Sequence, residues 1–263
     1  MTTIAVTGAT DGIGRATARR LLAAGHRVLV HARSEERGRP VVDALAGDGG
    51  GEAVLVTGDL ASLAEVRGLA EQIRDAGGTD VLIHNAGVWV RGAAPRLSAD
   101  GIELTLAVNV LAPHLLTGLL ADDLAAREGA RLLWLGSGMA AAGRPKPTAL
   151  GGERGPRQAY ADSKACDIAL AMAWGRRLPT VASAAVDPGW VDTKLAGPGA
   201  PGSPDTSAET LAFCATEADL RQAPYWHDHA PTPVPGRLRD QGLQDAIAAV
   251  CDRMTGLAAP ARS

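Results

Sequence analysis

The sequence has no excess of positive charge and no long uninterrupted apolar run. Lys and Arg number 26 against 29 Asp and Glu, and the pI is near 6.1. This balance gives no electrostatic reason to expect nucleic acid or an anionic membrane as a partner. No apolar stretch reaches membrane-spanning length without a charge. The N-terminus enters an apolar strand at once, without the basic segment of a signal peptide, so we expect a cytoplasmic protein.

Cysteine and clustered metal ligands are also scarce. The three cysteines are scattered and show no Cys-x-x-Cys spacing: Cys166, Cys214 and Cys251. Free thiols in a reducing compartment are therefore expected, rather than a disulfide framework. His227 and His229 lie close together, but no third ligand is apparent, so we expect no metal site. His114 lies within an apolar helical stretch and is expected to be structural.

Lysine and tyrosine are rare, and one of each stands four residues apart. The chain has three lysines and two tyrosines, among them Tyr160 and Lys164 in Tyr-Ala-Asp-Ser-Lys. On a helix, residues i and i+4 share a face. An ammonium about 4 Å from a phenol stabilises the phenolate by roughly 4 kcal/mol at an intermediate dielectric. Such a phenol is a general acid–base usable at neutral pH. The same spacing also fits a surface tyrosine beside a solvated lysine.

Short apolar runs alternate with stretches of helical periodicity along most of the chain. Strands are expected at residues 3–7, 27–31, 53–57, 80–84, 130–136 and 181–186. Helices are expected near residues 13–24, 35–46, 62–76, 100–127 and 158–177. This alternation predicts an α/β fold: one doubly wound Rossmann-type domain over residues 1–263, with a parallel sheet of about seven strands and helices on both faces.

The C-terminal third is richer in Gly and Pro. Residues 192–208 follow the sixth expected strand, at the sheet edge where open α/β folds bind ligands. They are expected to form either a mobile lid over a substrate or a surface turn. Residues 223–236 are expected to form a last short strand and an extended arm, within a C-terminal arm spanning about 223–263.

A glycine-rich turn, Thr7–Gly14, joins the first strand to the first helix. Its glycines permit a tight turn, and the helix N-terminus offers free N–H groups to a pyrophosphate. The Gly-x-x-x-Gly-x-Gly spacing differs from the Gly-x-Gly-x-x-Gly fingerprint but relies on the same physics. Similar turns also occur without a ligand, so the loop alone is modest evidence for a dinucleotide.

The second strand ends without the acid that NAD-selective sites usually place on the ribose 2′-hydroxyl. The sequence there is His31-Ala32-Arg33-Ser34. The guanidinium of Arg33 suits a 2′-phosphate, which favours NADP(H). Three nearby acids count against this choice: Asp11, Glu35 and Glu36. Arg33 could also be a solvated surface residue.

Further motifs follow the later strands in order. They are Asp59-Leu60, Asn85-Ala86-Gly87, Gly136-Ser137-Gly138 and Pro188-Gly189-Trp190-Val191-Asp192-Thr193. Together with the glycine-rich turn and the Tyr–Lys pair, they resemble the short-chain dehydrogenase/reductase (SDR) family along nearly the whole chain. The resemblance implies cofactor contacts from Gly8, Thr10, Asp11, Gly12, Ile13, Gly14, Arg33, Ser34, Asp59, Leu60, Asn85, Ala86, Gly87, Tyr160, Lys164, Pro188, Gly189, Val191 and Thr193.

The same resemblance implies a catalytic tetrad of Asn109, Ser137, Tyr160 and Lys164. NADPH would deliver hydride to a carbonyl carbon while Tyr160 donates a proton to the oxygen. Ser137 would hydrogen-bond that oxygen. Lys164 would act on the phenol and hold the nicotinamide ribose, and Asn109 would anchor a water leading from Lys164 to solvent.

Two features resemble the retinol-dehydrogenase-like branch of the family: residues 99–117, and the long gap between Ser137 and Tyr160. The extra residues 140–158 are expected to reshape the substrate mouth or to form a surface loop. Three apolar side chains follow motifs at the sheet edge and are candidates for substrate-pocket walls or for ordinary packing: Trp89, Met139 and Trp190.

We therefore expect an NADP(H)-dependent oxidoreductase that reduces a ketone or aldehyde of a lipophilic or polyketide-like small molecule. Non-redox or cyclising chemistry on the same scaffold, and a dinucleotide-sensing protein without turnover, are the alternatives. The expected helices 100–127 and 158–177 are apolar nearly all round, more than one sheet face requires. A homodimer through these helices is the corresponding expectation.

Overall fold

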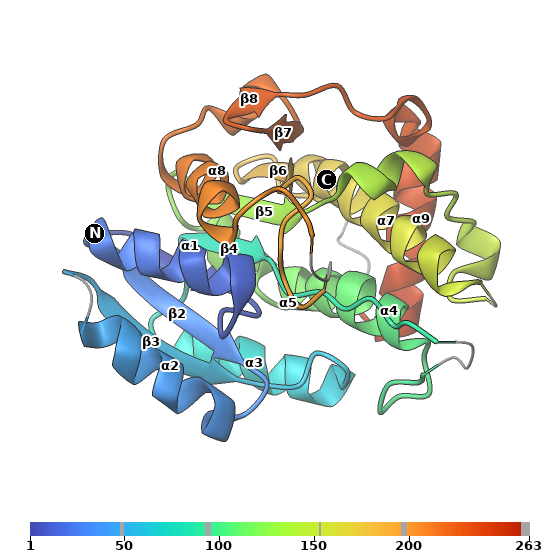
Figure 1. Cartoon of the computed structure of the whole chain (residues 1–263). Helices are drawn as coiled ribbons and strands as arrows, with labels where there is room; N and C mark the ends of the chain where they lie inside the picture. The colour runs from blue at the N-terminus through green and yellow to red at the C-terminus, as the bar shows by residue number, and fades with distance from the viewer. Residues whose placement is uncertain (48–49, 93–95, 153, 196–198, 259–263) are drawn as a thin grey trace.

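The computed structural model describes residues 1–47, 50–92, 96–152, 154–195 and 199–258. In these residues eight strands form one sheet in the order β3-β2-β1-β4-β5-β6-β7-β8 (Figure 1). The strands are β1 Thr3–Val6, β2 Arg27–Ala32, β3 Glu52–Thr57, β4 Val81–His84, β5 Arg131–Leu135, β6 Ala182–Asp187, β7 Tyr225–His227 and β8 Ala230–Pro231. All neighbouring pairs are parallel except β7 and β8. The doubly wound α/β prediction is confirmed, and β8 makes one strand more than the seven expected.

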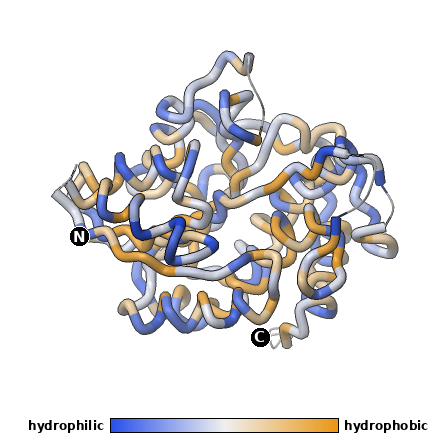
Figure 2. Tube along the Cα trace, turned by 60° about the horizontal axis from the view of Figure 1, so that its bottom comes forward, coloured by the Kyte–Doolittle hydropathy of each residue, from blue (hydrophilic) through white to orange (hydrophobic). Residues whose placement is uncertain are grey.

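Helices cover both faces of the sheet, which explains why the central strands are continuous apolar runs. On one face lie α1 Gly12–Ala23, α2 Glu35–Gly47 and α8 Pro204–Thr216. On the other lie α3 Leu63–Asp75, α5 Ala112–Leu119, α7 Pro156–Arg177 and α9 Gln241–Thr255. Figure 2 shows hydrophobic segments running through the middle of the molecule and hydrophilic ones on its outer turns. Each face therefore has its own apolar core.

The single helix expected over residues 100–127 is wrong. The chain instead forms α4 Leu104–Leu106, a π-helical segment η1 Ala107–Leu111, then α5, and after a break at Leu120 the short α6 Ala121–Ala125. Pro113 has no N–H to give the carbonyl four residues earlier, that of Asn109, so regular α-helical bonding is interrupted there. A π-helical turn accommodates the missing α-helical hydrogen bond, and such turns recur at functional sites.

Helices α8 and α9 were not predicted. α8 begins at Pro204, inside the segment expected to be a lid or turn, with Ser203 as its N-cap. α9 lies inside the expected C-terminal arm of residues 223–263, beyond the part expected to be extended; Asp240 caps its start and Gly256 ends it in the left-handed conformation. Both ends carry ordinary capping residues. The Gly- and Pro-rich composition just before each helix is typical of loops and outweighed the capping residues in the prediction.

α9 packs on α5 and α7, on the side away from the sheet. A buried polar network fastens it there. His114 Nε2 is 2.8 Å from Asp252 Oδ1, Trp174 Nε1 donates to His114 Nδ1 at 3.2 Å, and Arg177 donates two bonds to Asp252 at 2.7 and 3.0 Å. His114 is structural, as expected. The apolar character that suggested a homodimer through α5 and α7 is satisfied within the chain by α9, so that argument for a dimer no longer holds.

Candidate active site

The glycine-rich loop follows β1 and is packed too closely for side chains. Gly8 has φ of +64°, and a Cβ on it would lie 2.9 Å from the Ala86 Cα atom. A Cβ on Gly14 would lie 2.3 Å from the Asn85 amide nitrogen. Thr10 and Asp11 complete the loop, and residues 12–14 form the first turn of α1, with Asp11 as N-cap. Only glycine allows this approach between the ends of β1 and β4.

Hydrogen bonds tie this loop to the segment Asn85–Gly87. The Thr7 hydroxyl oxygen accepts the backbone N–H groups of Asn85 and Ala86 at 3.0 and 3.1 Å. The Asn85 amide donates to the Thr7 carbonyl at 2.8 Å. His31 supports the loop from β2: its Nδ1 accepts from Gly8 N at 2.9 Å, and its Nε2 lies 2.8 Å from the Gly58 carbonyl. Burial lowers the pKa of His31, in keeping with a neutral ring.

The motif residues at the ends of β2 and β3 meet at one corner of the sheet. Arg33 is 62% exposed, and its Nε lies 3.7 Å from Asp59 Oδ2. Leu60 is buried, while Ser34 lies just before α2. Glu35, which had counted against a 2′-phosphate, binds Arg39 at 2.8 Å. Arg33 therefore has solvent around it at the corner where the sequence predicts the adenosine end of a dinucleotide.

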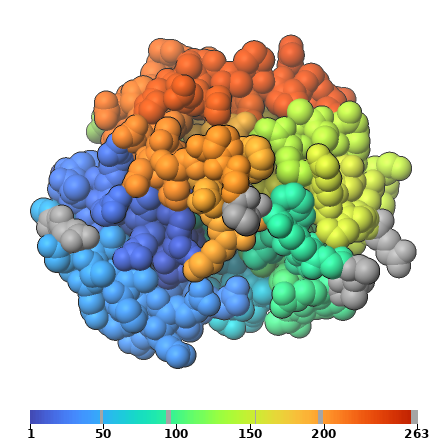
Figure 3. All heavy atoms as spheres, in the orientation of Figure 1, coloured from blue at the N-terminus to red at the C-terminus, as the bar shows by residue number. Residues whose placement is uncertain are grey.

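The segment after β6 crosses the front of the glycine-rich loop. Thr193 packs against it: a Cβ on Gly12 would lie 3.3 Å from the Thr193 methyl group. Lys194 forms an ion pair with Asp11, and the hydrogen bond from Lys194 lowers the Asp11 pKa. Figure 3 shows this orange segment between the blue N-terminal region and the teal-green segment after β4. Residues 196–198 of the predicted lid lie outside the described residues.

The upstream residues of this motif are held by their neighbours. The Gly189 N–H donates to Asp187 Oδ1 at 2.9 Å, and the Ser207 hydroxyl donates to the Pro188 carbonyl at 2.7 Å. Val191 is buried and forms a parallel bridge with Gly202. The motif is therefore anchored to the start of α8.

Tyr160 and Lys164 lie on one face of α7, as predicted, and both are buried. The Lys164 Nζ atom lies 6.0 Å from the centre of the Tyr160 ring. It donates to the Leu135 carbonyl at 2.7 Å and to Asp167 Oδ2 at 2.8 Å. The first bond fastens α7 to the end of β5. A surface tyrosine beside a solvated lysine is therefore excluded.

Asn109 lies in the π-helical segment and bridges two elements. Its Oδ1 accepts from Val88 N at 2.7 Å, and its Nδ2 donates to the Val88 carbonyl at 3.0 Å and to the Ser163 hydroxyl at 2.9 Å. A Cβ on Gly87 would lie 3.5 Å from Asn109 Oδ1 and 3.7 Å from Lys164 Nζ. Asn109 and Lys164 thus converge on Gly87.

Ser137 follows β5 and caps the 3₁₀ segment η2, Gly138–Ala142, where its hydroxyl oxygen accepts from Met139 N at 3.2 Å. Met139 borders an open groove of about 610 Å³ between η2 and the start of α7, with walls that are mostly Gly, Ala and Pro. The first part of the extra segment 140–158 therefore borders this groove. Hydrogen bonds hold the segment: Arg144 N donates to Asp162 at 2.6 Å, and Arg237 donates to the Gly143 carbonyl at 2.9 Å.

The two candidate tryptophans differ. The Trp89 ring stacks on Tyr160 with centroids 4.9 Å apart and planes 13° from parallel. The Arg91 guanidinium lies 4.6 Å from the centre of the Trp89 ring and donates to the Leu195 carbonyl at 2.9 Å. Trp190, by contrast, is 65% exposed. Trp89 is thus a wall beside the phenol, whereas most of the Trp190 side chain faces solvent.

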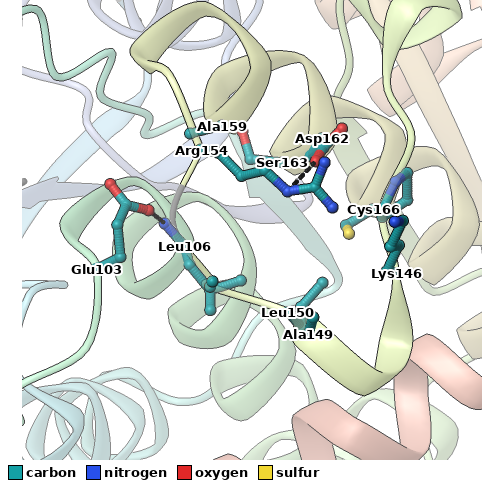
Figure 4. Close-up of a pocket in the computed structure, with 13 residues that line it drawn as sticks. Glu103, Leu106, Lys146, Ala149, Leu150, Arg154, Ala159, Asp162, Ser163 and Cys166 are labelled. Atoms are coloured by element: carbon teal, nitrogen blue, oxygen red, sulfur yellow. Dashed lines mark hydrogen bonds and ion pairs between the residues drawn. The ribbon is translucent and has the colours of Figure 1, made fainter.

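A second recess lies on the other side of α7 (Figure 4). Glu103 and Leu106 face residues of the segments 145–152 and 154–166 across a small, partly open space of about 30 Å³. Arg154 Nε is 3.8 Å from Asp162 Oδ2 there. Ser163 lines this recess and also binds Asn109. The middle of the 140–158 segment therefore packs in this recess, whereas its two ends, residues 141–142 and 155–158, border the groove.

Sequence reasoning missed Asp167, His31 and Arg91. Asp167 had a usable signal, because it stands three residues after Lys164 and seven after Tyr160, on the same helix face. Burial raises the pKa of Asp167 to about 6, although the nearby Lys164 charge acts in the opposite direction. His31 and Arg91 act through partners distant in sequence, so no local pattern marks them.

Within the described residues, no group of three or more His, Cys, Asp or Glu side chains could hold a metal ion. Over the same part of the chain, no helix combines the length and apolar character needed to cross a membrane.

A model of the short chain dehydrogenase family matches residues 2–201. The chain belongs to the short-chain dehydrogenase/reductase family. This SDR is 34% identical to an uncharacterized oxidoreductase of Emericella nidulans, over 99% of both chains. It is 36% identical to a proposed daunorubicin C-13 ketoreductase of Streptomyces sp. strain C5, over 92% of this chain and 88% of the relative. It is also 36% identical to polyprenol dehydrogenase of Mus musculus, over 95% and 83%. These relatives support the predicted retinol-dehydrogenase-like branch.

Solved structures resemble this SDR closely. A protein of Mycobacterium paratuberculosis superposes with a TM-score of 0.81 at 26% identity, over 98% of this chain and 94% of the other. A short chain dehydrogenase of Burkholderia cenocepacia, solved in complex with NADP, gives 0.67 at 30% identity, over 80% and 88%.

Proposed function

We propose that this SDR is an NADP(H)-dependent reductase of ketones or aldehydes. The observation that carries the proposal is the buried Tyr160–Lys164 pair, held against the ends of β4 and β5 beside a loop packed too tightly for side chains. A proton donor and a close-approach backbone cradle thus lie at the same sheet edge, where open α/β folds bind ligands.

The residues present fit a dinucleotide. The loop from Gly8 to Gly14 lets a pyrophosphate approach the backbone at the start of α1. Exposed Arg33 is free to turn from Asp59 to a 2′-phosphate, and Glu35 is engaged elsewhere. Lys194 neutralises Asp11 in the cradle, which reduces repulsion of phosphate. The relative from Burkholderia cenocepacia was solved with NADP, which agrees with this choice.

NADPH, when bound, supplies the hydride. Tyr160 then donates its phenolic proton to the carbonyl oxygen that becomes the alcohol. Ser137 hydrogen-bonds that oxygen and stabilises its developing charge. Lys164, fixed by two hydrogen bonds, favours the phenolate left behind and has a third N–H for a ribose hydroxyl. Asn109 holds the backbone at Val88 and, through Ser163, the start of the catalytic turn of α7.

The substrate we propose is a lipophilic or polyketide-like carbonyl compound. The groove beside Met139 has mostly apolar walls, and Trp89 presents an aromatic surface next to the phenol. The similarity to a proposed daunorubicin C-13 ketoreductase supports an aromatic polyketide ketone.

The test is an NADPH-oxidation screen over aldehydes, simple ketones, steroids and aromatic polyketide ketones. At least one class should be reduced by the wild type. Tyr160→Phe should abolish turnover, a loss of at least about a hundredfold, with NADPH binding retained. Tyr225→Phe, which removes the chain's other phenol hydroxyl, is the control and should keep its turnover. Unchanged turnover in Tyr160→Phe contradicts the mechanism, and NADPH binding without any turnover favours a dinucleotide sensor.

A further inference from the structure

Asp167 lies one turn beyond Lys164 and completes a line of polar residues on α7. Tyr160, Lys164 and Asp167 have the spacing i, i+4, i+7, which places them on one helix face. Asp167 Oδ2 lies 2.8 Å from Lys164 Nζ, and each of the two side chains is only 4% exposed. The carboxylate therefore touches the ammonium of the proposed tetrad directly.

Few other charges reach this pair. On α7 the titratable neighbour of Lys164 is Tyr160, and from the end of β6 the charge of Asp187 also acts on it. The Asn109 amide and Gly87 face Nζ from the side of η1 and β4 and are uncharged. Beyond the pair, Asp167 acts on the thiols of Cys166 and, from α9, Cys251. Asp167 is thus the one carboxylate bonded to Lys164 among the described residues.

Burial by itself would make the ammonium unstable. It lowers the pKa of Lys164, but the charges of Asp167, Tyr160 and Asp187 and the hydrogen bond that Lys164 donates to Asp167 outweigh it, and the pKa is raised above 10.5. A lysine stripped of its buried partner loses this compensation and sheds its proton at lower pH. The charge on the proposed catalytic lysine therefore depends on Asp167.

We propose that Asp167 is a positioning residue that holds Lys164 as an ammonium on the active-site face of α7 and thereby sets the alkaline limit of cofactor binding and reduction. The inference rests on the proposed function of this site.

Packing alone does not account for an ionised pair at this place. Removing two charges from water is expensive, and apolar residues of similar size often stabilise such a site as well or better. The second oxygen, Asp167 Oδ1, is buried and accepts no hydrogen bond from any described residue. This spare acceptor lets the carboxylate stay bonded to Nζ when the ammonium turns toward a ribose hydroxyl.

The direct test follows the ionisation of Lys164 by NMR, without cofactor or substrate. With only three lysines in the chain, its side-chain signals can be assigned with Lys164→Met. The Lys164 pKa should fall by at least about one unit in the nearly isosteric Asp167→Asn, equivalent to a tenfold change in proton affinity. Asp167→Glu, which keeps the negative charge, should leave the Lys164 pKa close to its wild-type value. If Asp167→Asn does not fold, Asp167→Ser takes its place.

The second readout is NADPH affinity, measured by quenching of tryptophan fluorescence between pH 5.5 and 10. At pH values above the lowered Lys164 pKa, the NADPH affinity of Asp167→Asn should fall about tenfold per pH unit relative to that of the wild type. Near and below pH 6 the two proteins should converge, because wild-type Asp167 itself becomes protonated with a pKa of about 6. Asp162→Asn is the matched control: it removes a carboxylate of the same helix that pairs with Arg154 instead.

Equal Lys164 titration in the wild type and Asp167→Asn overturns the inference, as does an affinity loss that is the same at every pH. A wild type that does not bind NADPH refutes the proposed cofactor, and the NMR titration still decides whether Asp167 keeps Lys164 charged.

Discussion

Single side chains near the candidate site are held by contacts that cross long stretches of sequence. The Asn109 amide bonds the backbone at Val88 and the hydroxyl of Ser163, which lies 54 residues further on. His31 links Gly8 to Gly58, and Trp89 stacks on Tyr160. Each of these contacts satisfies a buried polar group or aromatic face that would otherwise be expensive to bury. Asn109 and Tyr160 are therefore each held by the Val88–Trp89 segment that follows β4.

Arg33→Ala tests the cofactor choice at the residue scale. Because the guanidinium is 62% exposed and its ion pair with Asp59 is as long as 3.7 Å, its loss should not affect folding. The dissociation constant of NADPH should rise by about tenfold or more, and that of NADH should change much less. Fluorescence titration of both cofactors measures the ratio.

Arg19→Ala, which removes an arginine of α1 that binds Asp205, is the control for a general loss of positive charge. Equal weakening of NADPH and NADH by Arg33→Ala would mean that the residue does not read the 2′-phosphate.

At the scale of elements, α7 carries Tyr160 and Lys164, and α9 packs against its outer side. α7 contacts β5, β6, η1 and α9, and its buried residues surround it on most sides. The helix–helix contact with α9 uses Ile247, Ala248 and Cys251 for packing and Asp252 for polar fastening. Losing α9 would expose the outer side of the helix that holds Tyr160 and Lys164.

Asp252→Ala tests this fastening. The substitution leaves His114 and Arg177 without their shared carboxylate, and the Asp252 side chain is only 7% exposed. The free energy of unfolding should fall by about 3 kcal/mol at pH 7, measured by urea denaturation. Asp245→Ala, which removes a 57% exposed partner of Arg176, should cost under about 1 kcal/mol. Similar losses for both variants would contradict a special role of the buried network.

The stability loss in Asp252→Ala should depend on pH. Burial acts to raise the pKa of Asp252, but the hydrogen bonds from His114 and Arg177 outweigh it and the pKa is lowered. A carboxyl with a lowered folded pKa stabilises the fold above its unfolded value of 3.8, and this contribution is lost as pH falls through the folded pKa. The difference between wild type and Asp252→Ala should therefore be full at pH 7 and shrink below about pH 4.

At the scale of the whole molecule, the chain covers both faces of its sheet and also the outer side of α5 and α7. The α9 helix occupies the surface through which the sequence had suggested a homodimer. Gly118 allows this closure, because a Cβ there would lie 2.1 Å from the Leu257 side chain. A second subunit could use this surface only after displacing a buried ion network.

We therefore expect a monomer of 26.9 kDa in solution. Sedimentation velocity at micromolar and tenfold higher concentration measures this directly. A stable particle of twice that mass would show that another surface of the chain mediates association, or that α9 moves aside.

The sequence by itself determined the strands β1 to β6, the glycine-rich turn and the shared helix face of Tyr160 and Lys164. These depend on local turn chemistry, apolar periodicity and helical spacing, all legible within a few neighbouring residues. The sequence did not predict the break at η1 or the helices α8 and α9, because Pro113 and the Gly- and Pro-rich flanks gave competing local signals. Tertiary structure alone decided that Lys164 is buried against the end of β5, that Trp89 lies on Tyr160, and that α9 covers the outer side of α7. Those outcomes depend on burial and on distances between elements far apart in the chain, where a charge or an apolar face takes its meaning from what is packed against it.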